Sequence, residues 1–324
     1  MRILSGMRPT GYLHLGHLCV LENWLELQKE HECFFFVADW HALTTEYENP
    51  RSIKEYTYAM VADWLAVGLD PEKSVIFVQS QVPAHAELHL IFSMFTPLSW
   101  LERVPTYKDQ VRKLKALGKD ITTYGFLGYP LLQAADILIY LAEGVPVGED
   151  QLPHIELCRE IARRFNYLYA PIFPEPQGIL AEVKLVPGID GQKMSKSYRN
   201  VIPLTASTEE LAELVNRMVT DPARIHKHDP GHPEVCTVFQ YHRIYQPERA
   251  KDIETACRRG EIGCVACKKD LAAVLDRRLA PIREKRAEIL ARPDYLREVL
   301  EEGKEKARAV ANATLARVRE ALNL

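Results

Sequence analysis

Two uninterrupted apolar runs near the N-terminus limit most strongly what this chain can fold into. The segment Cys33–Asp39 reads CFFFVAD, and Ser74–Ser80 reads SVIFVQS. Apolar runs of this length are typical of strands that are buried on both faces of a sheet. The segment between them, Ile53–Val67, has the apolar period of a helix. Strands separated by helices predict a parallel, doubly wound sheet.

The remaining pattern completes the predicted fold. Arg2–Ser5 predicts a short first strand, and Leu15–Glu30 predicts a helix because its apolar residues recur with a helical period. Residues 83–177 read as mostly helical, and the residues after about 203 read as helix. We therefore predict an α/β fold, with a doubly wound, Rossmann-like parallel sheet, a helical insertion and a C-terminal all-helical domain.

Local signals predict where individual helices begin and end. Ser52 with Glu55, and Ser207 with Glu210, each have the spacing of a capping box at a helix start. Gly68 predicts the end of the helix that begins near residue 53, because glycine adopts the left-handed conformation of a helix C-terminus.

The overall charge and composition exclude several classes of protein. The 324 residues carry a formal charge of −3, so no global basic field marks the chain as a nucleic-acid-binding protein. No uncharged apolar run reaches the roughly 20 residues that span a bilayer, and no signal-peptide pattern opens the chain. We expect a cytoplasmic protein without a membrane segment, in which the seven cysteines stay reduced.

A turn rich in glycine and histidine follows the first predicted strand. Gly11, His14, Gly16 and His17 lie within this short turn. In an open parallel sheet, ligands bind where a strand passes into a helix. Glycine lets a ligand approach the backbone, and histidine rings offer N–H donors. The pattern favours a nucleotide site, and capping or packing roles for the two histidines are the alternative.

A second candidate element is the sequence KMSKS at Lys193–Ser197. Two lysines three residues apart, beside small hydroxyl side chains, suit a mobile clamp on a polyphosphate. For a K-x-x-K pattern taken alone, a solvated run of charges is the alternative.

HLGH and KMSKS together resemble the two motifs of the class I aminoacyl-tRNA synthetases. Three further segments, Pro9–His17, Tyr129–Tyr140 and Val145–Asn166, are similar to bacterial tryptophanyl-tRNA synthetases, and the resemblance runs through essentially the whole chain. It implies a tryptophan–tRNA ligase, which activates L-tryptophan with ATP to the adenylate and pyrophosphate and transfers it to the 3′ end of its tRNA. The tyrosyl enzymes share the fold and are the nearest alternative.

The resemblance also implies the residues of the catalytic site. His14 and His17 would contact the phosphate and ribose region. Lys193 and Lys196 would hold the leaving pyrophosphate together with Mg²⁺. Arg8 stands where many relatives have glutamine, which leaves its role open. The residues implied for ATP binding are Arg8, Pro9, Thr10, Gly11, Gly16, His17, Gly148, Glu149, Asp150, Leu185, Lys193, Met194, Ser195, Lys196 and Ser197.

Asp136 is a carboxylate within the apolar segment QAADILI, and such a group needs a partner. An indole N–H can only donate a hydrogen bond, so a fixed acceptor is suited to recognise it, although a phenol O–H could also donate to the same acceptor. The alternative is a carboxylate paired with an internal arginine. By resemblance, Asp136 reads the indole of tryptophan. Tyr129 and His41 would border the pocket, and Gln151 would face the amino group.

The predicted domains follow from the pattern and the resemblance together. Residues 1–203 would form the catalytic domain, with the insertion at roughly 83–177. Residues 204–290 would form a helical anticodon-binding domain, and residues 291–324 would form helices that pack back on the body. Basic residues between Arg258 and Arg286 would contact tRNA phosphates, although a solvated helix face explains any one of them nearly as well. A homodimer is implied by resemblance alone.

Four cysteines of the predicted anticodon-binding domain have the spacing C-x20-C-x6-C-x2-C: Cys236, Cys257, Cys264 and Cys267. Unrelated thiols, a zinc site and a 4Fe–4S cluster are the three interpretations, and the spacing alone leaves zinc and iron–sulfur level. A subset of tryptophanyl-tRNA synthetases has a similar pattern and binds such a cluster. The resemblance therefore implies a 4Fe–4S cluster, with zinc as the alternative.

Two functions outside this enzyme class fit part of the pattern. A nucleotidyltransferase that activates a carboxylate or phosphate without tRNA fits HLGH, but KMSKS and the basic C-terminal module fit it poorly. A synthetase-like binding protein that has lost catalysis is disfavoured by the four intact motif residues, His14, His17, Lys193 and Lys196.

Overall fold

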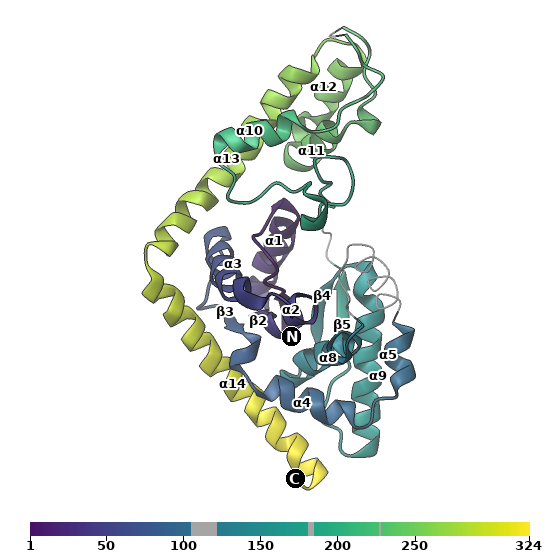
Figure 1. Cartoon of the computed structure of the whole chain (residues 1–324), viewed down its shortest axis with the longest axis vertical. Helices are drawn as coiled ribbons and strands as arrows, with labels where there is room; N and C mark the ends of the chain where they lie inside the picture. Colours follow the sequence, from purple (N-terminus) through teal and green to yellow (C-terminus); the bar gives the residue numbers. More distant parts are fainter. Residues whose placement is uncertain (105–121, 181–184, 227) are drawn as a thin grey trace. The chain divides into compact units, whose positions relative to one another are not determined.

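The described part of the chain contains a five-stranded parallel sheet (Figure 1). The computed structural model describes residues 1–104, 122–180, 185–226 and 228–324. Neighbouring strands all pair in parallel, in the order β3-β2-β1-β4-β5, which confirms the predicted doubly wound α/β class. The strands are β1 (Arg2–Met7), β2 (Glu32–Val37), β3 (Ser74–Val78), β4 (Gly144–Val147) and β5 (Gln177–Leu180).

The two apolar runs form β2 and β3. Every residue of β2 after Glu32 is buried, as a strand covered on both faces requires. The helices α1 (Leu15–Glu30) and α3 (Ile53–Val67) have the predicted bounds. Trp24 of α1 stacks on Phe35 of β2 with ring centroids 4.3 Å apart, and Trp64 of α3 packs edge-on against Trp24. These aromatic contacts join both helices to the sheet.

Two of the three predicted helix-end signals are confirmed. Gly68 ends α3 with a φ of 123°, and Ser207 with Glu210 forms a complete capping box before α10 (Thr208–Asn216). The box predicted at Ser52 is wrong. The chain enters α3 through a 3-10 turn, so Ser52 already has helical torsion angles and its side chain makes no capping hydrogen bond. A capping side chain needs a non-helical backbone to turn back on the helix.

The segment predicted as a helical insertion follows α2 (Asp39–Glu46) and α3. Its described helices are α4 (Ala84–Ser93), α5 (Leu98–Arg103), α7 (Tyr124–Leu127), α8 (Tyr129–Ile139) and α9 (Leu152–Leu168). It also contains β4, and β5 begins at its end. The sequence pattern predicts neither strand, because four residues offer only two side chains to each face, and Pro146 inside β4 argues against a strand.

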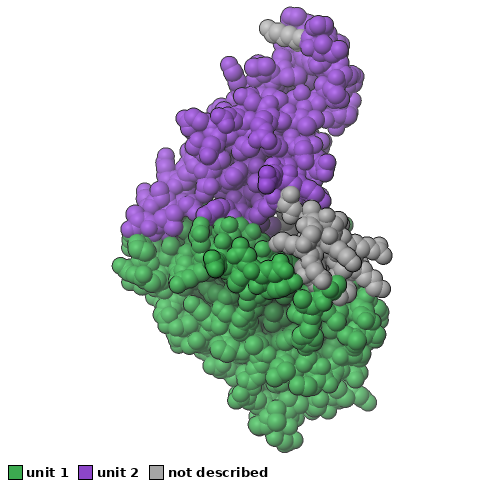
Figure 2. Space-filling model, in the orientation of Figure 1, with its two compact units in different colours: residues 1–11, 23–182, 292–324 green, residues 12–22, 183–291 purple. Residues whose placement is uncertain are grey.

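The chain divides into two compact units (Figure 2). We call residues 1–11, 23–182 and 292–324 the sheet unit, and residues 12–22 and 183–291 the helical unit. In the sheet unit, α14 (Pro293–Leu322) packs against β3 and α4 (Figure 1). A Cβ at Gly303 would lie 1.8 Å from the carbonyl oxygen of Ile76, so glycine is required for this close approach. The functional boundary near residue 203 stays a prediction.

The helical unit contains four longer helices, α10, α11 (Thr237–Tyr245), α12 (Pro247–Arg258) and α13 (Cys264–Leu290). Leu271, Leu275 and Leu279 of α13 are fully buried and recur every four residues, so they form the apolar stripe by which this helix packs. None of the helices in the described ranges is both long enough and apolar enough to cross a membrane.

Candidate functional site

Two segments of the sheet unit follow neighbouring strands at the point where the strand order reverses. Arg8–Gly11 follows β1, and Gly148–Gln151 follows β4. In open parallel sheets, ligands bind outside the carboxyl ends of the strands at such a point. Gly11 has a φ of 137°, a conformation that favours glycine. The topology therefore brings residues predicted for ATP binding from two distant segments to one edge of the sheet.

The side chains at this edge are polar. Gly148–Asp150 is exposed, and the Gln151 amide donates to the Asp150 carboxylate at 3.1 Å. The guanidinium carbon of Arg8 lies 5.9 Å from the centre of the Tyr129 ring. Carboxylates accept hydrogen bonds from hydroxyl groups, and a guanidinium binds anions. This edge can therefore bind a ligand that has both hydroxyl groups and negative charge.

Asp136 on α8 is the centre of a buried polar group, and its carboxylate is 1% exposed. Oδ1 accepts from the Gln79 amide at 2.8 Å and lies 2.6 Å from Nδ1 of His85. Oδ2 lies 2.7 Å from Nε2 of His41. The partners are two imidazoles and an amide, rather than the arginine of the sequence alternative. We call Asp136, His41, Gln79, His85 and Tyr140 the Asp136 cluster.

Tyr140 determines which nitrogen of His85 carries the proton. Burial, and then the charge of Asp136, raise the pKa of Tyr140 well above its usual value, so the hydroxyl keeps its proton. This hydroxyl lies 2.7 Å from Nε2 of His85. With Tyr140 donating to Nε2, the Nδ1–H of His85 donates to Asp136.

The Asp136 cluster keeps its carboxylate charged. Burial favours the neutral carboxyl group, but the imidazoles of His41 and His85 outweigh burial and lower the pKa of Asp136 to about 2. At neutral pH, Asp136 is therefore a hydrogen-bond acceptor only. His41 also packs edge-on against Tyr129, with ring centroids 4.2 Å apart, so two predicted pocket residues are in contact.

Sequence reasoning identifies Asp136 and His41 but misses Gln79, His85 and Tyr140. One signal was present, because Gln79 directly follows β3, and ligand-binding side chains concentrate at the carboxyl ends of parallel strands. His85 lies in the first turn of α4 rather than directly after a strand, so no such signal marks it.

His14 and His17 face each other in the helical unit, with ring centroids 3.9 Å apart. The backbone N–H of His14 donates to Nδ1 of His17, and the backbone N–H of Gly16 donates to Nδ1 of His14, both at 3.2 Å. Because both Nδ1 atoms accept, the neutral rings carry their proton on Nε2. Each ring therefore has an N–H donor that the backbone does not use.

Lys196 of the KMSKS sequence acts on both histidines. Burial, and then the Lys196 ammonium, lower the pKa of His14 to about 4. Burial, His14 and Lys196 lower the pKa of His17 well below its usual value. A Cβ at Gly16 would lie 3.1 Å from the His14 ring and 3.8 Å from the Met194 sulfur. The fold of the helical unit thus brings the two sequence motifs together, with neutral rings beside a cation.

Asn200 is a buried residue that holds the KMSKS loop. Its Oδ1 accepts from the backbone N–H of Ser195 at 2.8 Å. Its Nδ2 donates to the carbonyl of Lys193 at 3.1 Å and to the carboxylate of Asp190 at 2.8 Å. Sequence reasoning misses Asn200, although an amide with both donor and acceptor is suited to binding loop backbone. Lys193 itself is exposed.

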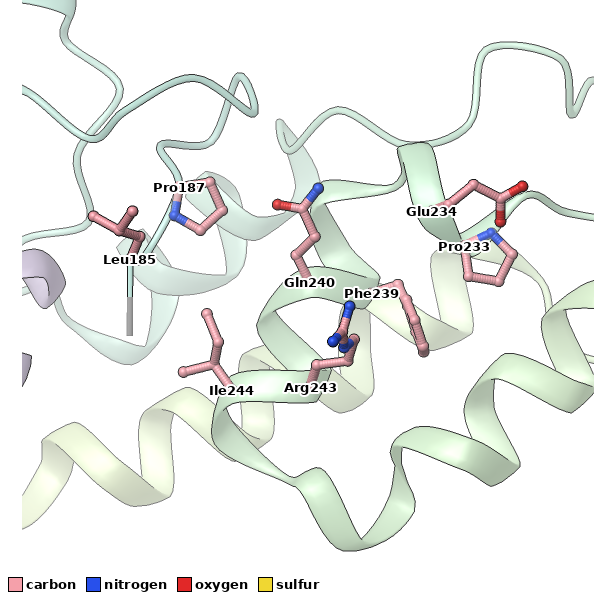
Figure 3. A pocket seen from close by; sticks show the side chains of 8 residues that line it. All are labelled: Leu185, Pro187, Pro233, Glu234, Phe239, Gln240, Arg243 and Ile244. Carbon is pink, nitrogen blue, oxygen red and sulfur yellow. The ribbon is translucent and has the colours of Figure 1, made fainter. Parts of the chain in front are cut away.

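A cavity of about 500 Å³ lies beside the segment that leads into this loop (Figure 3). The Tyr241 hydroxyl donates to the carbonyl of Pro187 at 2.5 Å, which ties the segment to α11. Leu185, which has a predicted ATP-binding role, is exposed at the cavity. The lining residues are Leu185, Pro187, Pro233, Glu234, Phe239, Gln240, Arg243 and Ile244.

The four predicted metal ligands, which we call the cysteine group, lie at helix ends of the helical unit. Cys236 directly precedes α11, and Cys257 lies in the last turn of α12. Cys264 and Cys267 lie in the first turn of α13. Helix N-termini favour thiolates. Burial raises the pKa of Cys236, and backbone N–H groups at the start of α11 partly oppose this effect.

The thiols of the cysteine group are close enough to affect one another. Burial, followed by the charges of the other three cysteines, raises the pKa of Cys267 to about 12. A Cβ at Gly231 would lie 2.5 Å from the sulfur of Cys257, so this sulfur packs closely against the glycine, and the Arg224 guanidinium donates to the same sulfur at 3.8 Å. No three His, Cys, Asp or Glu side chains of the described residues are arranged to hold a single metal ion.

The comparisons with known proteins all indicate the same family. The family model described as "tRNA synthetases class I (W and Y)" matches residues 1–280. The chain is 58% identical to the tryptophan–tRNA ligase of Thermotoga maritima, covering 100% of this chain and 99% of that protein. It is 47% identical to the tryptophan–tRNA ligase of Aquifex aeolicus, with both covered completely. The structure of a Campylobacter jejuni tryptophanyl-tRNA synthetase complexed with ADP and tryptophan matches with a TM-score of 0.90 at 34% identity, covering 100% of both chains.

Proposed function

Because this chain belongs to the class I tRNA synthetases of the tryptophan and tyrosine type, we infer that it is a tryptophan–tRNA ligase. It activates L-tryptophan with ATP to tryptophanyl-adenylate and pyrophosphate, and it transfers tryptophan to the 3′ end of its tRNA. The observation that carries this conclusion is the 58% identity to a tryptophan–tRNA ligase over the whole chain. A tRNA-charging enzyme works where translation takes place, which supports a cytoplasmic location.

The reaction needs positioning and charge stabilisation rather than a protein nucleophile. The tryptophan carboxylate is already an anion, so it attacks the α-phosphate directly and displaces pyrophosphate. His14 and His17 are proposed to donate their Nε2–H groups to the phosphate and ribose region. Neutral rings suit this role, because they donate to the ligand without binding a proton from it. Mg²⁺ bound with ATP would neutralise part of the phosphate charge.

Lys193 and Lys196 are proposed to hold the leaving pyrophosphate as charge builds up on it. The contacts of Asn200 with the KMSKS loop support this role, because they fix the backbone that carries both lysines. The other proposed ATP-binding residues come from the two segments after β1 and β4, from the start of α1, and from the KMSKS loop and the segment that leads into it. They are Arg8, Pro9, Thr10, Gly11, Gly16, Gly148, Glu149, Asp150, Leu185, Met194, Ser195 and Ser197.

Asp136 is proposed to accept the indole N–H, with Tyr129 and His41 bordering the ring and Gln151 facing the amino group. The charge and burial of Asp136 support this role. A buried carboxylate that must find a donor rejects ligands without one, because its lone pair is then left unpaired.

We propose that the cysteine group holds a 4Fe–4S cluster. The helix N-termini at Cys236 and Cys264 support this role, because they favour the thiolate form of cysteine that binds iron. In such a cluster each cysteine binds a different iron, so the thiols stand farther apart than around one ion. The preference for the cluster over zinc rests on the resemblance of the cysteine spacing to that of the tryptophanyl-tRNA synthetases that bind such a cluster. When bound, the cluster would link α11, α12 and α13.

The tRNA is proposed to contact basic residues of the helical unit. Several of the predicted cations are already paired: Arg258 with Glu254 and Glu234, and Arg283 with Asp276. For these residues the alternative of a paired helix face has gained support. Cations with no ion pair to the described residues remain the better candidates for phosphate contacts, and these are Lys269, Arg277, Lys285 and Lys268, whose ammonium donates to the carbonyl of Asn216.

A homodimer is proposed on the basis of an exposed apolar surface on the sheet unit. Leu90 of α4, Met94 directly after α4 and Leu98 at the start of α5 are 56%, 73% and 57% exposed. Several large apolar side chains that are exposed within one short segment are a feature of protein interfaces. Substituting Met94→Lys should convert the dimer to a monomer in sedimentation measurements.

The test of the proposed function is ATP–pyrophosphate exchange with each of the twenty amino acids. Exchange with tryptophan should exceed exchange with every other amino acid, including tyrosine. Exchange that depends more strongly on tyrosine would contradict the assignment of tryptophan, and exchange without any amino acid would indicate a different nucleotidyltransferase.

A further inference from the structure

Asp136 alone does not account for recognition of the substrate, because most of its acceptor capacity is used within the protein. A carboxylate accepts about four hydrogen bonds. Gln79 and His85 occupy both acceptor positions of Oδ1, and His41 occupies one of Oδ2. One position on Oδ2 therefore remains for a ligand, and it must share that oxygen with the His41 ring.

A second buried acceptor lies one turn away on the same helix. Tyr129, Gln133, Asp136 and Tyr140 occur at intervals of four, three and four residues along α8 and its C-terminal end, which places them on one face of the helix. Oε1 of Gln133 is buried, and it has no hydrogen-bond partner among the described residues. A buried carbonyl oxygen without a donor costs free energy, so a ligand that donates to it binds more tightly.

The direction of the substrate selects which of its donors reaches Gln133. Tryptophan has one indole N–H and an ammonium group with three more. Its carboxylate must reach ATP, and the residues proposed for ATP in the sheet unit lie at the carboxyl ends of β1 and β4, where Gly148–Asp150 is exposed. The indole therefore points toward the buried helix face that carries Asp136 and Gln133.

Resting on the proposed function, we propose that Gln133 is a second specificity-determining residue for tryptophan, whose Oε1 accepts the indole N–H together with Asp136. The N–H is shared between a charged and an uncharged acceptor on one helix face. Nδ1 of His41, another buried polar atom without a partner among the described residues, stays available for the ammonium group.

The test compares two ligands on two variants. The ligands are tryptophan and its analogue in which sulfur replaces the indole N–H, β-(benzothiophen-3-yl)alanine. Gln133→Met keeps the length of the side chain and removes the acceptor. Leu132→Met, on the neighbouring face of the same helix, is the matched control. Dissociation constants are measured by calorimetry without ATP.

Gln133→Met should weaken tryptophan binding about three- to tenfold, the size of one hydrogen bond between uncharged groups. Binding of the sulfur analogue should change less than about twofold, and Leu132→Met should affect neither ligand. Equal weakening of both ligands would overturn the proposal, as would unchanged tryptophan binding. If the unmodified protein does not bind tryptophan at all, the proposed function itself fails.

Thermal unfolding of the ligand-free variants separates recognition from a structural role. Gln133→Met removes a buried acceptor that has no donor in the ligand-free protein, so its melting temperature should equal or exceed that of the unmodified protein. A lower melting temperature would show that Gln133 serves the fold, and it would overturn the proposal.

Discussion

The Asp136 cluster and the cysteine group both gather reactive side chains from distant segments, but they hold charge in opposite ways. The carboxylate of Asp136 is surrounded by hydrogen-bond donors, and its pKa is lowered although it is fully buried. The cysteines surround one another, and their mutual effect adds to burial in raising the pKa of Cys267. The carboxylate of the first group is held by donors of the protein before a ligand arrives, whereas the second group needs a cationic centre to hold its thiolates together.

This difference predicts what each group contributes. A carboxylate that is hydrogen-bonded before the substrate arrives can discriminate between substrates at little free-energy cost for its own ordering. An incomplete group gains its order from the metal, so binding energy of the metal becomes folding energy of the surrounding helices. Removing one member should therefore damage substrate recognition in the sheet unit and local stability in the helical unit.

The largest effect is expected for Asp136→Ala. The substitution leaves Gln79, His41 and His85 without their acceptor in a buried site, and each unpaired donor costs about 1–3 kcal/mol. We expect the free energy of unfolding to fall by about 2–5 kcal/mol in urea titrations, and tryptophan-dependent exchange to fall about 100-fold, as loss of a hydrogen bond to a charged group allows.

Asp136→Asn is the matched control, because the amide keeps an acceptor oxygen and nearly the same volume. It should lose less stability than Asp136→Ala. If Asp136→Ala unfolds at the same urea concentration as the unmodified protein, the hydrogen bonds of the Asp136 cluster do not stabilise the fold.

Acid should reveal the charge of Asp136 with a smaller effect. The pKa of this carboxyl is about 2 in the folded protein, below its ordinary value of 3.8. A lowered pKa means that the charge contributes its full stability above about pH 4, and that this contribution is lost as the pH falls toward 2. The difference in unfolding free energy between the unmodified protein and Asp136→Asn should shrink by about 2 kcal/mol across this window. A pH-independent difference would contradict the lowered pKa.

The sequence predicts the parts of the fold and site that depend on local pattern. The runs CFFFVAD and SVIFVQS predict β2 and β3, and the helical periods predict the bounds of α1 and α3. The short strands β4 and β5 escape prediction because their pairing comes from neighbours in the sheet rather than from their own residues. Ser52 misleads because a preceding turn had already set its backbone in a helical conformation.

For the site, the sequence predicts the central residue of a cluster better than its partners. Asp136 is conspicuous as a carboxylate in an apolar segment, whereas Gln79 and His85 lie in a different segment and look ordinary there. Asn200 is missed for the same reason, because its role is to bind the backbone of a loop. Partners that tertiary structure brings together leave no periodic signal in the sequence.

In the helical unit, Gly231→Ala should have a moderate effect. The new Cβ would lie 2.5 Å from the sulfur of Cys257 and would force this side chain to move. Overpacking of this kind costs about 1–3 kcal/mol, and displacement of one proposed ligand should lower the iron content of anaerobically purified protein. Gly125→Ala is the control, because a Cβ at Gly125 meets nothing closer than 4.0 Å. Full iron content in Gly231→Ala would show that Cys257 is not a ligand of the metal centre.

The smallest effect on tryptophan activation is expected for the substitution Cys264→Ser in the cysteine group. Cys264→Ser should remove iron and lower the resistance of α11, α12 and α13 to proteolysis, because without the metal the remaining cysteines no longer link these helices. Tryptophan-dependent exchange should stay within about twofold of the unmodified protein, since all members of the Asp136 cluster are residues of the sheet unit.

Anaerobic protein that is brown and holds about four irons per chain supports the proposed 4Fe–4S cluster. One zinc per chain favours the alternative, because zinc in a structural site is bound by four ligands at one ion. A large loss of tryptophan activation in Cys264→Ser would break the comparison, because it would show that order in the cysteine group is needed to maintain the Asp136 cluster.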